Sequence, residues 1–197
     1  MKYFLFIFIL HLFYLNAEGQ HLKSVIDPET ENVGFINEKG LLIVPYIYEQ
    51  HYKCSYKFKD SLCLVRRNGR YGYINQKGKE IVNCIYTYLG PLSDGVIASV
   101  IKDSIPICSY LNAQGNVILR IQGRFPYDFH NGLARFLFQG KYGYINKTGQ
   151  IVIPNIYQTA TDFEDGTARV IFEDKEIRVI NCKGEILKTS KIPKLIK

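Results

Sequence analysis

The sequence contains no tryptophan and no pair of cysteines with Cys-x-x-Cys spacing. Its four histidines and five cysteines do not stand in a ligand-like pattern, so we expect no zinc site. The Gly-x-Ser-x-Gly, His-Glu-x-x-His and phosphate-loop motifs are also absent. Esterase, metalloprotease and nucleotide-binding chemistry therefore lack support, and we expect neither an enzyme nor a cofactor.

A helical pattern is missing as well, since no segment of ten or more residues shows a convincing helical period. Aromatic residues are plentiful instead, with 15 Tyr and 12 Phe in a chain of 197 residues. Charges of both signs are interspersed, which argues against disorder. The composition predicts one domain with a sizeable core.

The first segment is an apolar run from Tyr3 to Leu15, preceded by one lysine and followed by small residues at 17 and 19. A membrane span needs about 20 apolar residues, so this run is too short. It has the features of a secretory signal. We predict that residues 1–19 are cleaved before Gln20, with an uncleaved membrane anchor as the alternative. Residues 20–197 would then be exported, to the periplasm, cell surface or medium, without a membrane span.

The net charge is +7, and removing Lys2 and Glu18 leaves it unchanged. Lysines and arginines are scattered singly, often at turns, which is typical of a solvated surface. The alternative is a weak attraction to an acidic envelope component or polysaccharide. A nucleic-acid partner is not expected, because no recognition motif is present and export removes the opportunity.

One motif, Asn-x-x-Gly, recurs along the chain. Its five copies are Asn37–Gly40, Asn75–Gly78, Asn112–Gly115, Asn146–Gly149 and Asn181–Gly184. The glycines are spaced by 38, 37, 34 and 35 residues. A nearly fixed period in this range indicates stacked supersecondary units.

The residue types of this motif predict a β-hairpin. Asn suits the first position of a type I turn, and Gly supplies the left-handed conformation at the fourth. Such a turn joins antiparallel strands with a bulge. The flanks, such as Tyr-Gly-Tyr-Ile and Ile-Val-Ile-Pro, are aromatic and β-branched, as strands are. Pro45 and Pro154 are expected to end the second strand of their hairpins.

A further strand precedes each hairpin. Segments 58–65, 129–136 and 163–170 begin with Phe, pass through a short turn and alternate residue by residue, and 92–100 is a looser copy. Asn68-Gly69 and Gln139-Gly140 form tight links to the hairpins. We predict an all-β array of five three-stranded antiparallel meanders, elongated or curved, with a propeller-like ring as the alternative. The predicted units are 22–48, 58–86, 92–120, 129–157 and 163–190.

These motifs resemble the bacterial WG (KWG) repeat, which is named after a Trp-Gly pair. Here Tyr71 and Tyr142 stand in the Trp position of the best copies, and Val33, Cys108 and Ile177 in the others. The paired glycine is Gly34, Gly72 or Gly143, with Ser109 and Arg178 in the third and fifth copies. The resemblance implies a β-rich repeat array, commonly exported or in the envelope, without a shared enzymatic activity.

Three tyrosines are candidate binding residues. Tyr48, Tyr86 and Tyr157 each follow a turn glycine by eight residues. They either pack between units or form a periodic aromatic surface that stacks on glycan rings or a peptide. The function we expect is a non-catalytic exported module for protein–protein or envelope interaction, with a glycan-binding module using these tyrosines as the alternative.

The cysteines and turn aspartates are interpreted structurally. Cys63 aligns with Ala98, Ala134 and Ala168, so we expect a small buried residue, and Cys108 takes a core position. In an exported chain, Cys54 with Cys63 or Cys84 is a conceivable disulfide. The recurring acids Asp60, Asp94 and Asp165 lack the acidic ladder of a calcium loop and are predicted to form turns.

Overall fold

The computed structural model describes residues 21–102, 106–121 and 125–191. All regular elements in these ranges are β-strands, so the all-β prediction is confirmed. No helix that could span a membrane occurs among these residues. The predicted signal at 1–19 lies outside the described residues.

The strands form five separate antiparallel sheets, taken here as the five units in chain order. The first has β1 (Lys23–Ile26), β2 (Val33–Ile36) and β3 (Leu42–Tyr48), and the second has β4 (Leu62–Arg67), β5 (Arg70–Asn75) and β6 (Glu80–Tyr86). The third has β7 (Tyr88–Ser93), β8 (Val96–Lys102), β9 (Pro106–Asn112) and β10 (Val117–Ile121). The fourth has β11 (Leu133–Phe138), β12 (Lys141–Asn146) and β13 (Ile151–Tyr157), and the fifth has β14 (Thr159–Ala160), β15 (Thr167–Ile171), β16 (Glu176–Asn181) and β17 (Ile186–Lys191).

The third and fifth units have four strands, where three were predicted. The extra strands, β7 and β14, begin after single linking residues, Thr87 and Gln158. The backbone of each linking residue already donates to the sheet that follows, to Val100 O and Ile171 O at 2.8 Å. The same bond occurs before the second unit, where the Glu49 N–H donates to Arg66 O at 2.8 Å, but there the chain leaves the sheet in the loop 49–61 and no fourth strand forms.

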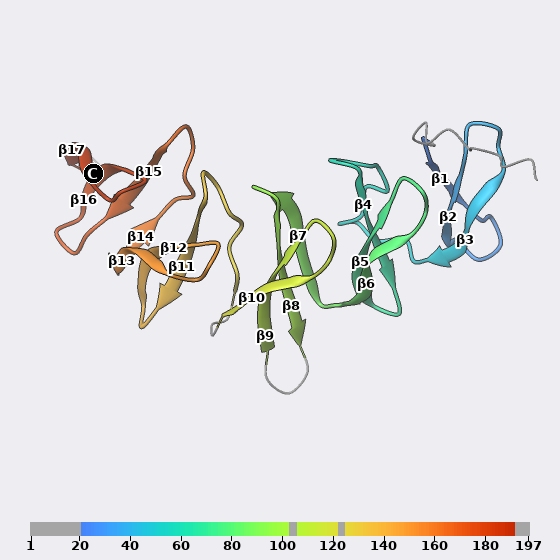
Figure 1. The fold of residues 1–197 in the computed structure, drawn as a ribbon, viewed down its shortest axis with the longest axis horizontal. Helices are drawn as coiled ribbons and strands as arrows, with labels where there is room; N and C mark the ends of the chain where they lie inside the picture. The colour runs from blue at the N-terminus through green and yellow to red at the C-terminus, as the bar shows by residue number, and fades with distance from the viewer. Residues whose placement is uncertain (1–20, 103–105, 122–124, 192–197) are drawn as a thin grey trace, which may run out of the picture.

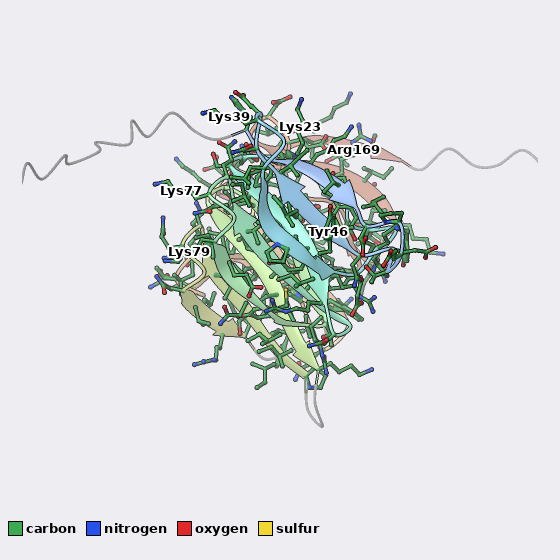
Figure 2. All side chains as sticks on the ribbon, turned by 90° about the vertical axis from the view of Figure 1, so that its right-hand side faces the viewer. Lys23, Lys39, Tyr46, Lys77, Lys79 and Arg169 are labelled. Carbon is green, nitrogen blue, oxygen red and sulfur yellow. The ribbon has the colours of Figure 1, made fainter. Side chains whose placement is uncertain are left out.

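The five sheets follow one another in a curved row, with the first and last at opposite ends (Figure 1). The array is open, and the ring that we held as the alternative does not form. Seen along the row from the first sheet, the sheets lie behind one another (Figure 2). Because no strand of one sheet pairs with a strand of another, side chains and turns carry most of the contact between units.

The five Asn-x-x-Gly turns have one geometry, as predicted. In the fourth unit the Asn146 side-chain oxygen accepts hydrogen bonds from the backbone N–H groups of Thr148 and Gln150, both at 3.0 Å. The Gly149 N–H donates to the Asn146 carbonyl at 2.9 Å. The turn glycines have φ between +76° and +83°. The turn thus needs an asparagine-like acceptor and a residue that tolerates positive φ.

The shorter turns before the strand that precedes each hairpin (β4, β8, β11 and β15) have two consecutive residues at positive φ. These pairs are Asp60-Ser61, Asp94-Gly95, Asn131-Gly132 and Asp165-Gly166. The tight links Asn68-Gly69 and Gln139-Gly140 have the same signs. Two positive φ values are the mark of a type I′ hairpin turn, which explains the Asx-Gly preference. Three of the four turns therefore use an aspartate as a turn former.

The glycine of the Trp-Gly position is required by a bulge in the neighbouring strand. Between the pairs Tyr142–Tyr157 and Tyr144–Ile153, β12 has one residue, Gly143, and β13 has three. A Cβ on Gly143 would lie 2.7 Å from both Ile153 O and Asn155 N. Gly34 and Gly72 face the same bulge in β3 and β6, with 2.7 and 2.6 Å to the nearest carbonyl oxygen.

The two copies without this glycine lack the bulge at that point. Ser109 pairs directly with Arg120, and Arg178 pairs directly with Thr189. A regular pair leaves room for a side chain, so serine and arginine are tolerated. Pro45 and Pro154 lie inside β3 and β13 and do not end them, contrary to the prediction. Both strands are sheet edges, where a missing N–H costs little at a bulge.

Adjacent units are joined by a hydrogen bond that repeats along the row. The hydroxyls of Tyr73, Tyr110 and Tyr144 donate to the carbonyls of Gly90, Tyr127 and Thr161 at 2.8 to 2.9 Å. In each case the acceptor follows the tyrosine by 17 residues and belongs to the chain entering the next unit. We call this contact the tyrosine clasp.

The same rings form the core between units. Tyr110 packs against Phe129, and Tyr144 against Phe163, with ring centroids 4.8 Å apart in both pairs. In the first unit Phe35 takes the tyrosine position and packs against Phe58 at 5.9 Å. The buried clusters therefore lie mainly between sheets, each built from two consecutive units.

We expect valine at Gly78 or Gly149 to lower the free energy of unfolding by more than valine at Gly40. All three glycines have positive φ, and strain of this kind costs about 1–3 kcal/mol. In addition, a Cβ at Gly78 would lie 2.6 Å from Val44, and one at Gly149 would lie 2.8 Å from Leu119. Gly40 has no atom within 4 Å of the added Cβ, so Gly40→Val isolates the strain. Denaturant unfolding measures the difference, and equal losses at the three sites would contradict the packing of turns on the preceding unit.

A second prediction concerns the bulge. Gly143→Ala should destabilise the protein by about 2 kcal/mol, because the methyl group meets backbone atoms of β13. Ser109→Ala, at the equivalent site without a bulge, should change stability little. Thermal melts of the two variants measure this, and a Gly143→Ala variant as stable as the parent would refute the explanation of the glycine.

Candidate functional site

The three tyrosines predicted as candidate binding residues are buried. Tyr48, Tyr86 and Tyr157 are 1%, 6% and 3% exposed. The Tyr48 hydroxyl donates to Glu80 of the next unit at 3.0 Å, and the Tyr157 ring meets Phe172 edge-on at 4.9 Å. The glycan-binding alternative on these residues is therefore wrong, since their ring faces are not available for stacking. They pack between units.

The alternation of side chains along each strand explains why the residue next to each tyrosine is exposed instead. The residue before each of these tyrosines is an isoleucine, Ile47, Ile85 or Ile156, and each is 40% to 48% exposed. Successive side chains of a strand point to opposite faces, so burying the tyrosine exposes the isoleucine. The sequence gives both positions apolar residues and does not say which one faces the core.

A groove lies between the second and third units. It consists of two adjoining hollows of about 170 and 270 Å³, both lined by Lys53, Leu64, Tyr73 and Pro91. The smaller one adds Ser55, Lys57, Lys59, Asp60, Leu62 and Leu92, and the larger one adds Tyr71, Tyr88, Leu89 and Gly90. We call this the lysine groove.

The loop that supplies the lysines, residues 49–61, is held in place by its own contacts. The Cys54 N–H donates to the His51 carbonyl at 2.9 Å, and the His51 N–H donates to the Tyr56 hydroxyl at 2.9 Å. The Tyr56 hydroxyl in turn donates to the Glu49 carbonyl. His51 Nδ1 also lies 3.2 Å from the Tyr71 hydroxyl. The lysine backbone is thus positioned before any ligand arrives, which lowers the entropic cost of binding.

The opposite wall comes from β7, which the tyrosine clasp fixes. The Tyr73 hydroxyl of the second unit donates to the carbonyl of Gly90 at 2.8 Å, which ties β7 to β5. Tyr88 stands exposed on this wall. Beside the groove, Tyr52 is 86% exposed and its ring lies 5.8 Å from the Lys53 ammonium.

The electrostatics of the groove are dominated by cations. Lys53, Lys57 and Lys59 are exposed, and Asp60 is the one acidic residue in the lining. Leucine, proline and tyrosine side chains form most of the remaining surface. Such a lining suits a ligand that carries both carboxylates and apolar groups. No group of three potential metal ligands occurs in the described ranges.

No disulfide joins the five cysteines, all of which lie in described parts of the chain. Burial raises the pKa of Cys63 to about 12 and that of Cys84 to about 11. Both thiols are therefore protonated near neutral pH and poor nucleophiles. Cys63 pairs with Ile74 and is fully buried, as Ala134 is opposite Ile145.

One alignment in the third unit needs correction. The residue equivalent to Cys63 there is Ile97, which pairs with Leu111, and Ala98 pairs with Tyr110 one position later. The Asp94-Gly95 turn sets this register, because it ends directly before Val96. Ala98 therefore takes the place that Arg135 has in the fourth unit, opposite Tyr144.

Sequence reasoning did not find the lysine groove. The three lysines lie in the irregular loop 49–61, and the other wall comes from a different unit. The local signal was Lys57-Phe58-Lys59, whose alternation places both lysines on one side of an extended chain.

The WG containing repeat family matches residues 34–71, 71–104 and 142–175, just over half of the chain. The chain belongs to this family. In this WG protein the Trp position is buried in the first three units, at Val33, Tyr71 and Cys108, and half-buried at Tyr142 and Ile177. The hydrogen-bonding ring of the clasp lies two residues later, at Tyr73, Tyr110 and Tyr144.

Solved structures resemble the WG protein at low sequence identity. A structure of the eukaryotic initiation factor shares 11% identity with a TM-score of 0.55, over 88% of this chain and 52% of that chain. The Kluyveromyces lactis Hsv2 structure gives 13% and 0.49 over 88% and 61%. A computationally designed Ika8 protein gives 14% and 0.47 over 86% and 57%. The WG protein spans little more than half the length of these chains, and the first match shows a likeness of fold alone.

No curated protein sequence matches the WG protein.

Proposed function

We propose that this WG protein is an exported, non-catalytic interaction module that binds an acidic, partly apolar segment of another protein in the lysine groove. The observation that carries the proposal is the groove itself, in which three lysines stand over an apolar surface on a pre-positioned loop. A β-repeat array is a fold that suits a protein-interaction role.

The chemistry of the groove favours a polypeptide over an acidic polysaccharide. Leu62, Leu64, Pro91 and Leu92 offer no hydrogen bonds from their side chains to sugar hydroxyls. They do offer apolar contact to leucine- or valine-like side chains, while the lysines attract carboxylates. An envelope protein with alternating acidic and apolar residues fits both parts of the lining.

Export is supported by the apolar run from Tyr3 to Leu15 and the small residues at 17 and 19.

A short fluorescent peptide of alternating glutamate and leucine tests the groove. We expect saturable binding that weakens with salt, and a loss of about tenfold in affinity for the Lys53→Glu/Lys57→Glu variant. The matched control is Lys39→Glu/Lys77→Glu, which changes the charge equally at exposed turn lysines outside the groove (Figure 2). The control should bind like the parent.

Two results would contradict this proposal. Equal weakening by both double variants would mean that net charge alone attracts the peptide. Tighter binding of polyglucuronate than of the peptide, lost in the groove variant, would assign the site to polysaccharide instead.

Export predicts a processed N-terminus. The full-length chain, expressed in a bacterial host, should appear in the periplasm or medium with a mass that begins at Gln20. Leu5→Arg/Ile9→Arg, which interrupts the apolar run, should keep the chain unprocessed. A parent protein that stays at full length in the cytosol would exclude a cleaved signal.

A further inference from the structure

Asp128, in the chain that enters the fourth unit, carries an unsatisfied carboxylate oxygen. Its Oδ1 is enclosed and has no hydrogen-bond partner in the described structure. Burial is the main cause that raises the pKa of Asp128; the charge of His130 opposes this rise and the charge of Asp162 adds to it. Enclosed carboxylate oxygens are nearly always paired, so this one calls for a physical explanation.

The next unit shows how the same carboxylate is satisfied. There the Arg135 guanidinium binds Asp162 through two hydrogen bonds, Nε to Oδ1 at 2.7 Å and Nη2 to Oδ2 at 3.2 Å. Its Nη1 donates to the Ala160 carbonyl at 2.8 Å, and its centre lies 4.3 Å from the middle of the Tyr127 ring. Asp162, a carbonyl and an aromatic ring thus hold one arginine side chain.

The two aspartates occupy equivalent positions. Asp162 directly follows Thr161, which accepts the clasp from Tyr144, and Asp128 directly follows Tyr127, which accepts the clasp from Tyr110. Arg135 pairs with Tyr144 across the sheet, whereas the residue that pairs with Tyr110 is Ala98. Alanine therefore stands where the arginine partner of Asp128 would be.

Gly90 is a second small residue at a position where another unit has a large one, and it lies beside Asp128. Gly90 accepts the clasp from Tyr73, and Tyr127 accepts it from Tyr110, so the two residues are equivalent. The Tyr127 ring covers Arg135, whereas Gly90 has no side chain. A Cβ on Gly90 would lie 2.7 Å from Asp128 Oδ1 and 3.3 Å from the Tyr88 hydroxyl. The larger hollow of the lysine groove reaches Gly90. Both the arginine and the ring over it are thus replaced by small residues next to a carboxylate.

We propose that Asp128, together with Gly90 and Tyr88, forms a receptor for an arginine side chain supplied by a protein partner. The inference rests on the proposed function only in that another protein provides the arginine. A guanidinium fits better than an ammonium because its planar donors satisfy both carboxylate oxygens, as Arg135 does at Asp162. The ligand completes an arrangement that the chain builds for itself one unit later.

The test uses N-acetyl-arginine methylamide, titrated into the isotope-labelled protein and followed through the backbone amides of Gly90, Ala98 and Asp128 by NMR. We expect saturable shifts at these amides. Asp128→Asn should weaken the binding by about tenfold or more, because the charge-assisted hydrogen bonds are lost. N-acetyl-lysine methylamide, with the same charge, should bind more weakly than the arginine probe.

Two further variants make the test independent of folding defects. Ala98→Arg places an arginine of the chain beside Asp128 and, once circular dichroism shows that the variant is folded, should abolish the response to the probe. Arg135→Ala empties the equivalent place at Asp162 and should create a second set of shifts there. A parent protein without saturable shifts, or an Ala98→Arg variant that is folded and binds like the parent, would overturn the proposal.

The outcome is separable from that of the lysine groove. The arginine probe has no carboxylate, so Lys53→Glu/Lys57→Glu should still bind it. A parent protein that binds the arginine probe but not the acidic peptide would remove the groove proposal alone, and a parent protein that binds the peptide but not the arginine probe would remove the arginine receptor alone.

Discussion

The structure depends on contact between sheets that are too small to be stable alone. Each sheet has three or four short strands, and none pairs with a neighbouring sheet. The tyrosine clasp and the aromatic pairs Tyr110–Phe129 and Tyr144–Phe163 join one unit to the next. Because every core cluster combines consecutive units, stability is shared along the row, as in other repeat proteins.

A close approach between two strands within a unit is a second constraint. The bulge in the last strand of the hairpin lies against Gly34, Gly72 and Gly143, and Ser109 or Arg178 takes this position where the strands pair regularly. Glycine at this position of the WG repeat is thus a response to a close backbone approach and has no need of a positive φ. The turn glycines are a different case, since all five have positive φ.

Departures from the repeat create the candidate sites. The loop 49–61 enters the second unit without forming a strand and brings three lysines to one groove. Gly90 and Ala98 replace a ring and an arginine, and Asp128 loses the partner that Asp162 has. In a repeat array, equivalent positions of two units can be compared directly. Where one unit has both partners of an interaction and another has only one of them, the remaining partner is a candidate binding residue.

The sequence by itself determined the all-β units, the five Asn-x-x-Gly turns and the tight links at Asn68-Gly69 and Gln139-Gly140, because turn chemistry is local and depends on the φ preference of each residue. It could not place Tyr48 inside and Ile47 outside, since both are apolar and only the neighbouring unit decides which face is covered. Three further features also depend on partners distant in the chain. These are the continuation of β13 past Pro154, the open form of the array, and the hollow that Lys53 and Pro91 line together. Only the tertiary structure decides these, because they arise from contacts between units.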